Sequence, residues 1–462
     1  MTTVSPPRER ALAPTRAQPS LLLPDRASYR RWDAVRMLQL FVVVLMLIPA
    51  DYVIKAVGAG GYAAALVSYV LLFFYLSSTL FGYHDPLALR YPVRMTVGFM
   101  WVVSLASYLM MDHGMLSGIQ LASAERWLMQ LAGVTGVVFV SAEFLRSVED
   151  MIRVLRVLIW GAAICGIVAI LQFKAGIDLT RYIRVPGFAL NAAAATNTGI
   201  GSRGGLNRVP GTATDPIELG VVAGMLMPIA IYLVMHDHQR PKWQRYLACV
   251  CVALNVPASV SRSGVIAIAV ACGVLLLSLP PVSRLKGFAL IPPALAVVFV
   301  FAHGLIGTLT SYFLAGSSDP SVTHRTNNYP YVAQLVKEYP WFGQGGGTYI
   351  PASAVNILDN EYLTTAIELG IIGVIALAFF LLWPPIAALV ARTRTTDRRL
   401  RDLGAALAGA GFAAGICSAT FDSFSFPMFV NVQALCAGLT GTLWLLVNQN
   451  DDTLIAGSGG YS

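Results

Sequence analysis

Residues 63–80 read AAALVSYVLLFFYLSSTL and contain no charged side chain. A helix needs about 20 mostly apolar residues to cross a hydrocarbon core of about 30 Å, and this stretch with its flanks meets that requirement. Residues 37–50, 95–111 and 222–235 have the same character. The repeated run predicts a chain that crosses a membrane several times.

The overall composition supports this prediction. Hydrophobic residues make up 56% of the chain and charged residues only 12%, whereas soluble domains carry about 25% charged residues. A large soluble protein would cover its core with amphipathic helices, and almost none are visible. The six cysteines lie in apolar runs without metal-site spacing, so we expect packing roles for them and no metal or other cofactor.

The hydropathy pattern predicts an all-α polytopic membrane protein with about twelve transmembrane helices. The expected transmembrane domain covers residues 36–448, between a disordered tail (1–35) and a second tail (449–462). Two long loops fall at about 174–215 and 304–360. The expected helices cover residues 37–57, 61–81, 94–112, 125–144, 155–173, 216–235, 245–260, 263–280, 287–303, 361–390, 403–421 and 427–448.

The net charge of +8 is unevenly distributed along the chain. The arginine-rich tail lacks the cleavage site of a secretory signal peptide. With the N-terminus in the cytoplasm and alternating helices, most Lys and Arg residues fall on the cytoplasmic side, as the positive-inside rule requires. We therefore interpret the basic tail as a topology signal, expect no nucleic-acid partner, and place both long loops on the outer side.

A group of arginines nevertheless falls on the outer side. An arginine at a hydrophobic turn is costly unless it pairs or faces a polar cavity, so these residues need a reason other than topology. They include Arg181, Arg184, Arg203, Arg208, Arg262 and Arg325.

Four short motifs surround these arginines. They are RVPGTATDPIELG (208–220), SVSRSG (259–264), HR (324–325) followed by YPWFGQGGG (339–347), and LDNEYLTTAIELGIIG (358–373). Each has a plain structural interpretation when taken alone. Asp215 suits a helix cap before Pro216, and the pair Asp359–Asn360 suits another.

Together the motifs place several arginines near a carboxylate at a membrane surface. Guanidinium groups bind phosphate through two hydrogen bonds and keep their charge. A nearby carboxylate can act as a general base. This combination suits a lipid-linked pyrophosphate as leaving group and a hydroxyl as nucleophile. Because the sequence shows no metal cluster, arginine would stabilise the leaving group.

In their order and sidedness the motifs resemble the O-antigen polymerase and ligase superfamily of bacterial envelopes (Wzy/WaaL-type). The pattern matches from the fifth expected helix to the tenth. The matching residues are Arg208, Gly211, Asp215, Pro216, Gly220, Arg262, Gly264, Arg325, Pro340, Gly343, Gly345, Asn360, Tyr362, Leu363, Glu368, Gly370 and Gly373.

The resemblance implies a membrane glycosyltransferase of the bacterial inner membrane, with its active site facing the periplasm. It would join polysaccharide repeat units carried on a polyprenyl pyrophosphate. Many members, the ligases above all, have His where this chain has Asp359, and this difference favours the polymerase. We expect Asp359, Arg262 and Arg325 to be catalytic. Substrate contacts are expected from Arg208, Asp215, His324, Asn360, Tyr362 and Glu368.

Several alternatives remain at the level of sequence. His324 is a rival base to Asp359, and Glu368 suits holding an arginine or a helix. A ligase would use the same site with lipid A core or a protein as acceptor. A flippase or transporter would place ionisable residues near the bilayer midplane; here charge gathers at helix ends, although Glu218 and Glu368 keep that reading open. The expected partners are lipid-linked oligosaccharide, membrane lipid, a chain-length regulator and a flippase.

Overall fold

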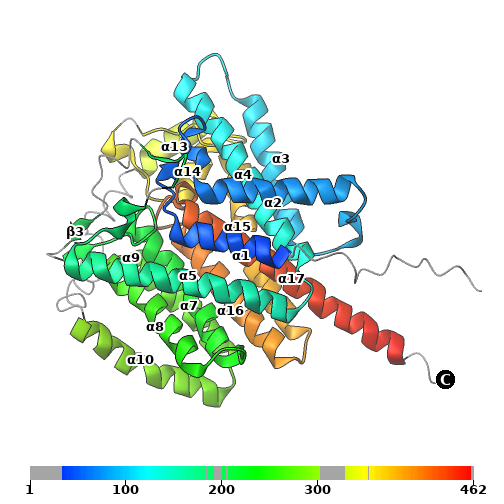
Figure 1. The fold of residues 1–462 in the computed structure, drawn as a ribbon. Helices are drawn as coiled ribbons and strands as arrows, with labels where there is room; N and C mark the ends of the chain where they lie inside the picture. The colour runs from blue at the N-terminus through cyan, green and yellow to red at the C-terminus, as the bar shows by residue number, and fades with distance from the viewer. Residues whose placement is uncertain are drawn as a thin grey trace, which may run out of the picture. The chain divides into compact units, whose positions relative to one another are not determined.

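The computed structural model describes residues 34–183, 185–191, 200–203, 206–301, 328–351 and 353–458. Helices dominate this part of the chain, and they form one compact unit that starts at Ala34 (Figure 1). Most of the predicted N-terminal tail lies outside the described residues. Two predicted site residues, His324 and Arg325, lie outside them as well.

The described helices follow the predicted order. They are α1 (Ala34–Leu47), α2 (Ala63–Leu80), α3 (Val93–Met110), α4 (Gly118–Phe144), α5 (Val148–Ala175), α7 (Pro216–His236), α8 (Lys242–Ser259), α9 (Arg262–Ser278), α10 (Pro281–Phe301), α13 (Tyr329–Glu338), α14 (Glu361–Glu368), α15 (Gly370–Thr393), α16 (Arg398–Cys417) and α17 (Pro427–Ser458). Short 3-10 turns also occur, and two of them flank the site: η1 (Gly58–Gly61) and η6 (Ser423–Ser425).

Eight of the helices in the described part are long and apolar enough to cross a membrane: α2, α3, α4, α5, α7, α15, α16 and α17. The shorter helices α1 and α9 are also apolar, and α8 and α10 occupy the two remaining predicted positions. The structure therefore confirms the predicted all-α polytopic membrane class.

The first predicted helix, 37–57, is too long. In the structure α1 ends at Leu47, close to Pro49, because proline donates no backbone hydrogen bond and disfavours helix before it. Tyr52–Val53 (β1) then pairs antiparallel with Ala189–Leu190 (β2). The first long loop therefore crosses back over the end of α1.

The tenth predicted helix, 361–390, is broken in the structure. The short helix α14 ends at Glu368, and α15 starts at Gly370, whose φ of 69° lies in the left-handed region. Glycine is the residue that adopts this conformation without strain. The last helix also differs, because α17 continues past the predicted end at 448 to Ser458.

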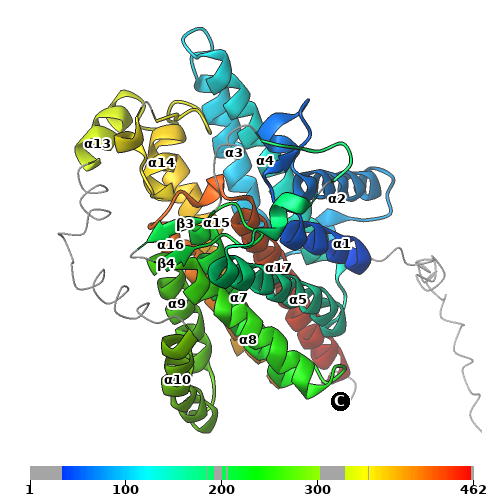
Figure 2. The same ribbon diagram turned by 60° about the vertical axis from the view of Figure 1, so that its left-hand side comes forward.

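The helix α7 lies among α8, α9 and α16 and packs against all three (Figures 1 and 2). Its backbone meets α9 directly: a Cβ added to Gly264 would lie 2.9 Å from the Cα of Gly220, and one added to Gly224 would lie 2.6 Å from the Cβ of Ala267. Small residues allow such close approach between membrane helices. The starts of α7 and α9 are therefore held together.

A small hairpin lies in the first long loop. Gly201–Arg203 (β3) pairs antiparallel with Leu206–Arg208 (β4), and Gly201 lies opposite Arg208. The Asn207 side chain donates to the carbonyl of Phe173 near the end of α5 (3.0 Å). The hairpin thus fixes Arg208 close to the helix bundle.

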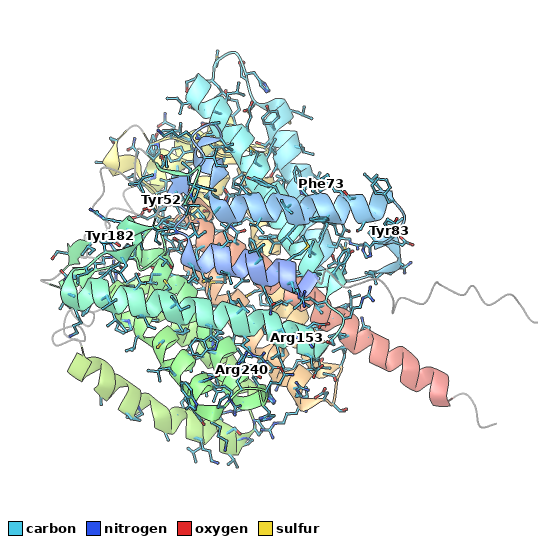
Figure 3. The ribbon with its side chains drawn as sticks, viewed as in Figure 1. Tyr52, Phe73, Tyr83, Arg153, Tyr182 and Arg240 are labelled. Atoms are coloured by element: carbon cyan, nitrogen blue, oxygen red, sulfur yellow. The ribbon has the colours of Figure 1, made fainter. Side chains whose placement is uncertain are left out.

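Among the described residues, the basic side chains predicted as cytoplasmic gather at one end of the bundle, here called the basic end. It comprises the turns α2–α3, α4–α5, α7–α8, α9–α10 and α15–α16. Arg153 and Arg240 lie here, away from Tyr52 and Tyr182 (Figure 3). Sequence analysis missed a buried network at this end, in which Glu143 accepts from Tyr91 and Arg94 (both 2.5 Å) and bonds to His84 (2.6 Å).

Candidate functional site

The starts of α7, α9, α14 and α17 meet at the end of the bundle opposite the basic end. The backbone N–H of Glu361 donates to the carbonyl of Ser418 (2.9 Å). The hydroxyl of Thr420 donates to that of Ser263 (2.8 Å). We call this region the site end. It brings together the described parts of all four sequence motifs.

Arg208 and Asp215 face each other at the start of α7. The Nη2 atom of Arg208 lies 3.6 Å from Oδ1 of Asp215, and both side chains are partly exposed. The same oxygen accepts from the N–H of Ile217 (2.6 Å), so Asp215 caps α7 as its plain structural interpretation expected. Asp215 therefore caps α7 and also contacts Arg208.

Glu218, one turn further into α7, is buried and fully engaged. Its Oε2 accepts from the N–H and the hydroxyl of Thr214 (both 2.8 Å), and its Oε1 accepts from the N–H groups of Met428 (2.7 Å) and Phe429 (3.1 Å). A carboxylate at these N–H groups caps the start of α17. The arrangement gives Glu218 a structural role.

Arg262 is the first residue of α9, and its side chain is half-buried. The turn before it contains Val260, whose φ of 47° lies in the left-handed region. Ser263 is fixed to the α16–α17 turn through Thr420, and Gly264 packs on α7. The Arg262 backbone is therefore fixed between α7 and the α16–α17 turn.

Asp359 lies directly before α14 and is half-buried. Its φ is 46°, and Val260 is the other non-glycine residue with a positive φ in the described part of the chain. Such conformations cost about 1–3 kcal/mol and cluster at functional sites. The next residues have structural bonds: Asn360 caps α14, and the hydroxyl of Tyr362 donates to the carbonyl of Gly415 (2.8 Å).

The glycine-rich run at 343–347 docks against the break between α14 and α15. Gln344 donates to the carbonyl of Ile367 (3.0 Å), Gly345 donates to that of Glu368 (2.9 Å), and Ile371 donates to that of Pro340 (2.9 Å). A Cβ on Gly343 would lie 2.3 Å from the carbonyl of Glu368. The run thus supplies backbone partners that the broken helix lacks.

Glu368 ends α14 with a buried side chain. Its Oε1 accepts from the N–H of Tyr349 (3.2 Å). Burial, together with the nearby negative charge of Asp422, raises its pKa to about 8. The carboxyl group is therefore mostly protonated at neutral pH, so it donates as well as accepts hydrogen bonds.

A cavity of about 530 Å³ opens among α4, α14, the η6 turn and the β1–η1 region. We call it the α4–α14 cavity. Thr214 and Leu358 line it, and these residues adjoin Asp215 and Asp359 in the chain. Its side chains include Asp51, Tyr62, Tyr69, Ser123, Arg126, Trp127, Gln130, Asn191, Tyr349, Glu361, Thr364, Glu368, Asp422 and Ser425.

Among the predicted site residues that the structure describes, only Glu368 lines this cavity. Sequence analysis missed Arg126, Glu361 and Asp422. Glu361 is buried; it accepts from the N–H of Phe424 (2.8 Å) and is hydrogen-bonded to Asp422. Burial and that neighbour raise the pKa of Glu361 well above its ordinary value. Glu361 lies within the fourth motif, but no motif marks Arg126 or Asp422, because tertiary packing alone brings the three residues together.

Residues 247–378 match the family model described as O-antigen ligase. The matched segment runs from α8 into α15 and contains Arg262, Asp359 and Glu368, whereas Arg208 and Asp215 precede it. A search of curated proteins found no match. The family match supports a function of O-antigen ligase or polymerase type, and it confirms the predicted relation of this chain to the O-antigen polymerase and ligase superfamily.

Proposed function

We propose that this protein is a membrane glycosyltransferase that polymerises polysaccharide repeat units carried on polyprenyl pyrophosphate. The observation that carries the proposal is the family match over 247–378, whose segment supplies both Arg262 and Asp359 at the site end. Arg208 and Asp215 reach the same end from the start of α7. The site end would face the periplasm, with the basic end in the cytoplasm, as the positive-inside rule favours.

The proposed reaction transfers the growing glycan from its carrier to the next unit. A sugar hydroxyl of the acceptor attacks the anomeric carbon of the donor, and a new C–O bond forms there. The bond from that carbon to the pyrophosphate oxygen breaks, and the electron pair leaves with the polyprenyl pyrophosphate. The carboxylate of Asp359 takes the hydroxyl proton. Arg262 and Arg208 stabilise the negative charge on the leaving group.

The remaining predicted residues have supporting roles in this proposal. Asp215 orients Arg208, to which it already lies close. Asn360 and Tyr362 hold the start of α14, and with it Asp359, through their bonds to the α14 backbone and to Gly415. His324 and Arg325 stay proposals from the sequence, His324 as the rival base to Asp359 and Arg325 as a further pyrophosphate or glycan contact.

A ligase reaction is the second candidate, because the matched family model is described as O-antigen ligase. It would use the same donor and a different acceptor. The presence of Asp359 where many ligases have His favours the polymerase.

The test uses a host whose own polymerase gene is deleted and which expresses this chain. Glycan is separated by size from cells with the unchanged protein, Arg262→Ala, Asp359→Asn and, as a control, Arg153→Ala at the basic end. We expect the first two variants to lose about 100-fold or more of the long chains and to accumulate single repeats. The control should match the unchanged protein.

Other outcomes discriminate between the candidates. Free lipid-linked polymer without attached polymer would indicate a ligase. Normal long chains from both site variants, at equal protein levels in the membrane, would refute the assignment of this site.

A further inference from the structure

The α4–α14 cavity contains polar and aromatic groups that the proposed reaction does not yet use. Arg126, Trp127 and Gln130 line it from α4, and Glu361 and Glu368 line it from α14. Its volume of about 530 Å³ lies within the range of about 300–1,000 Å³ that is typical of small-molecule sites. The cavity is large enough for a compact polar ligand.

The available hydrogen-bonding groups suit a ligand rich in hydroxyls. Arg126 contributes donors, the side-chain amides of Gln130 and Asn191 contribute both donors and acceptors, and the carboxyl groups contribute acceptors. Among the described residues, the half-buried guanidinium of Arg126 has no hydrogen-bond or ion-pair partner within the protein. A ligand hydroxyl in the cavity would supply one.

The cavity also offers aromatic surface. Trp127 is buried, with its indole N–H donating to the hydroxyl of Ser104 (3.0 Å), and its ring packs near Phe424 with 5.7 Å between ring centres. These contacts fix the ring while part of it lines the cavity. A sugar ring has an apolar C–H face as well as hydroxyls, and rigid aromatic side chains give such a face contact area.

The charge state of the carboxyl groups favours a neutral ligand. The pKa of Glu368 is raised to about 8 and that of Glu361 is raised well above its ordinary value. Glu368 is therefore mostly protonated at neutral pH, and its carboxyl group can donate to one hydroxyl while accepting from another. Because the pKa values of both groups are raised, a cation would gain less from them than from ordinary carboxylates.

We propose that the α4–α14 cavity is the acceptor-sugar subsite, in which Arg126, Gln130 and Trp127 hold the sugar that supplies the attacking hydroxyl. This inference rests on the proposed glycosyltransferase function. Leu358 lines the cavity and adjoins Asp359, and Thr214 lines it and adjoins Asp215. A sugar held here would lie beside the two segments that carry Asp359 and the Arg208–Asp215 pair.

The experiment separates the two halves of the site with two probes. One probe is the repeat-unit oligosaccharide released from its lipid carrier, which has no pyrophosphate. The other is polyprenyl pyrophosphate, which has no sugar. Binding of each is measured on the full chain in lipid nanodiscs, for the unchanged protein and for the variants Arg126→Gln, Arg126→Lys, Arg262→Ala and Glu125→Gln. Glu125 is the exposed neighbour of Arg126 on α4 and serves as the control.

We expect Arg126→Gln to weaken oligosaccharide binding by about tenfold to a hundredfold, as loss of a charged hydrogen bond does, and to leave polyprenyl pyrophosphate binding unchanged. The oligosaccharide affinity of Arg126→Lys should fall between that of the unchanged protein and that of Arg126→Gln. Arg262→Ala should show the reverse pattern, and Glu125→Gln should change neither probe. Size-exclusion profiles equal to that of the unchanged protein will show that the variants fold.

Three results would overturn the assignment of this subsite. The unchanged protein fails to bind the oligosaccharide at millimolar concentration, Arg126→Gln binds it normally, or Arg126→Gln loses polyprenyl pyrophosphate instead. The proposed function fails in a different way, namely if Arg262→Ala still binds polyprenyl pyrophosphate and still makes long chains. The two failures are therefore distinguishable.

Discussion

Two hydrogens from Thr214 and two from the start of α17 converge on the carboxylate of Glu218. Its Oε1 joins α7 to the start of α17, and its Oε2 fixes the turn before α7. A transporter would need an ionisable side chain that is exposed to a pathway and can change partners. Glu218, one of the two residues that kept a transport function open at the level of sequence, thus has a structural role.

The first prediction tests this structural role. Glu218→Gln replaces an acceptor-only carboxylate by an amide whose NH2 group meets N–H donors. Because at least one buried donor loses its partner, we expect a loss of about 1–3 kcal/mol in stability. The measurement is the thermal unfolding midpoint in nanodiscs, against Glu125→Gln as the exposed control. Equal midpoints for the two variants would contradict the structural role.

Glu368 gives the second prediction, which concerns pH. Its pKa in the folded protein is about 8, against an ordinary value of 4.5. Between these values the folded state keeps a proton that the unfolded state releases. Stability from this group therefore falls as pH rises from about 4.5 to 8, by about 1.4 kcal/mol per pH unit, and is constant above that range.

Glu368→Gln removes this titration but keeps a neutral polar group at the position. Its unfolding midpoint should fall less steeply than that of the unchanged protein between pH 5 and 8, with unfolding followed in the same buffers. Glu361 remains in the variant and contributes a slope of the same sign, so the slope should shrink without vanishing. Parallel curves would show that Glu368 is already ionised at neutral pH.

At the scale of elements, the glycine-rich run and the helix break form one unit. The carbonyls of Ile367 and Glu368 are satisfied by a loop that lies over 20 residues earlier in the chain. Gly343 and Gly370 both have left-handed φ angles, 68° and 69°. The motif residues that carry the resemblance to the family thus include glycines that shape the backbone behind Glu368.

The third prediction follows from this unit. Gly343→Ala adds a Cβ at 2.3 Å from the carbonyl of Glu368, at a φ that costs a non-glycine residue about 1–3 kcal/mol. We expect the loop to undock and the yield of folded protein to drop. The matched control is Gly98→Ala on α3, where a Cβ meets nothing within 4 Å. If both alanine variants are recovered at the level of the unchanged protein, docking of the glycine-rich run on the helix break does not stabilise the fold.

The sequence predicted most elements and fewer of the contacts between them. Apolar runs such as 63–80 locate helices because lipid demands them locally. Apolar residues continue on both sides of the break between Glu368 and Gly370, so hydropathy could not reveal that break. Asp215 and Asn360 could be predicted as caps from adjacent residues. Arg126 and Asp422 could not be joined to Glu361, because the three come from separate helices and turns.

At the scale of the whole molecule, the separation of the site end from the basic end predicts a topology. Met115 in the α3–α4 turn belongs to the site end, and Leu87 in the α2–α3 turn belongs to the basic end; both are 84% exposed. In a variant without native cysteines, Met115→Cys should react with a membrane-impermeant maleimide in intact spheroplasts. Leu87→Cys should react only after the membrane is permeabilised.

The comparison is controlled by the equal exposure of the two positions. If only Leu87→Cys is labelled in intact spheroplasts, the protein has the opposite orientation and the site end faces the cytoplasm. Labelling of both would show leaky membranes, which a cytoplasmic marker enzyme detects.

The backbone contact between α7 and α9 has a consequence for how the protein behaves in different bilayers. Helices adapt to thinner or thicker hydrocarbon by tilting. Because Gly220 touches Gly264 and Gly224 touches Ala267, neither helix can tilt without carrying the other along. Asp215 and Arg262 sit at the starts of this locked pair. Their spacing is therefore set by glycine and alanine contacts, and it stays constant when lipid composition changes the thickness of the membrane.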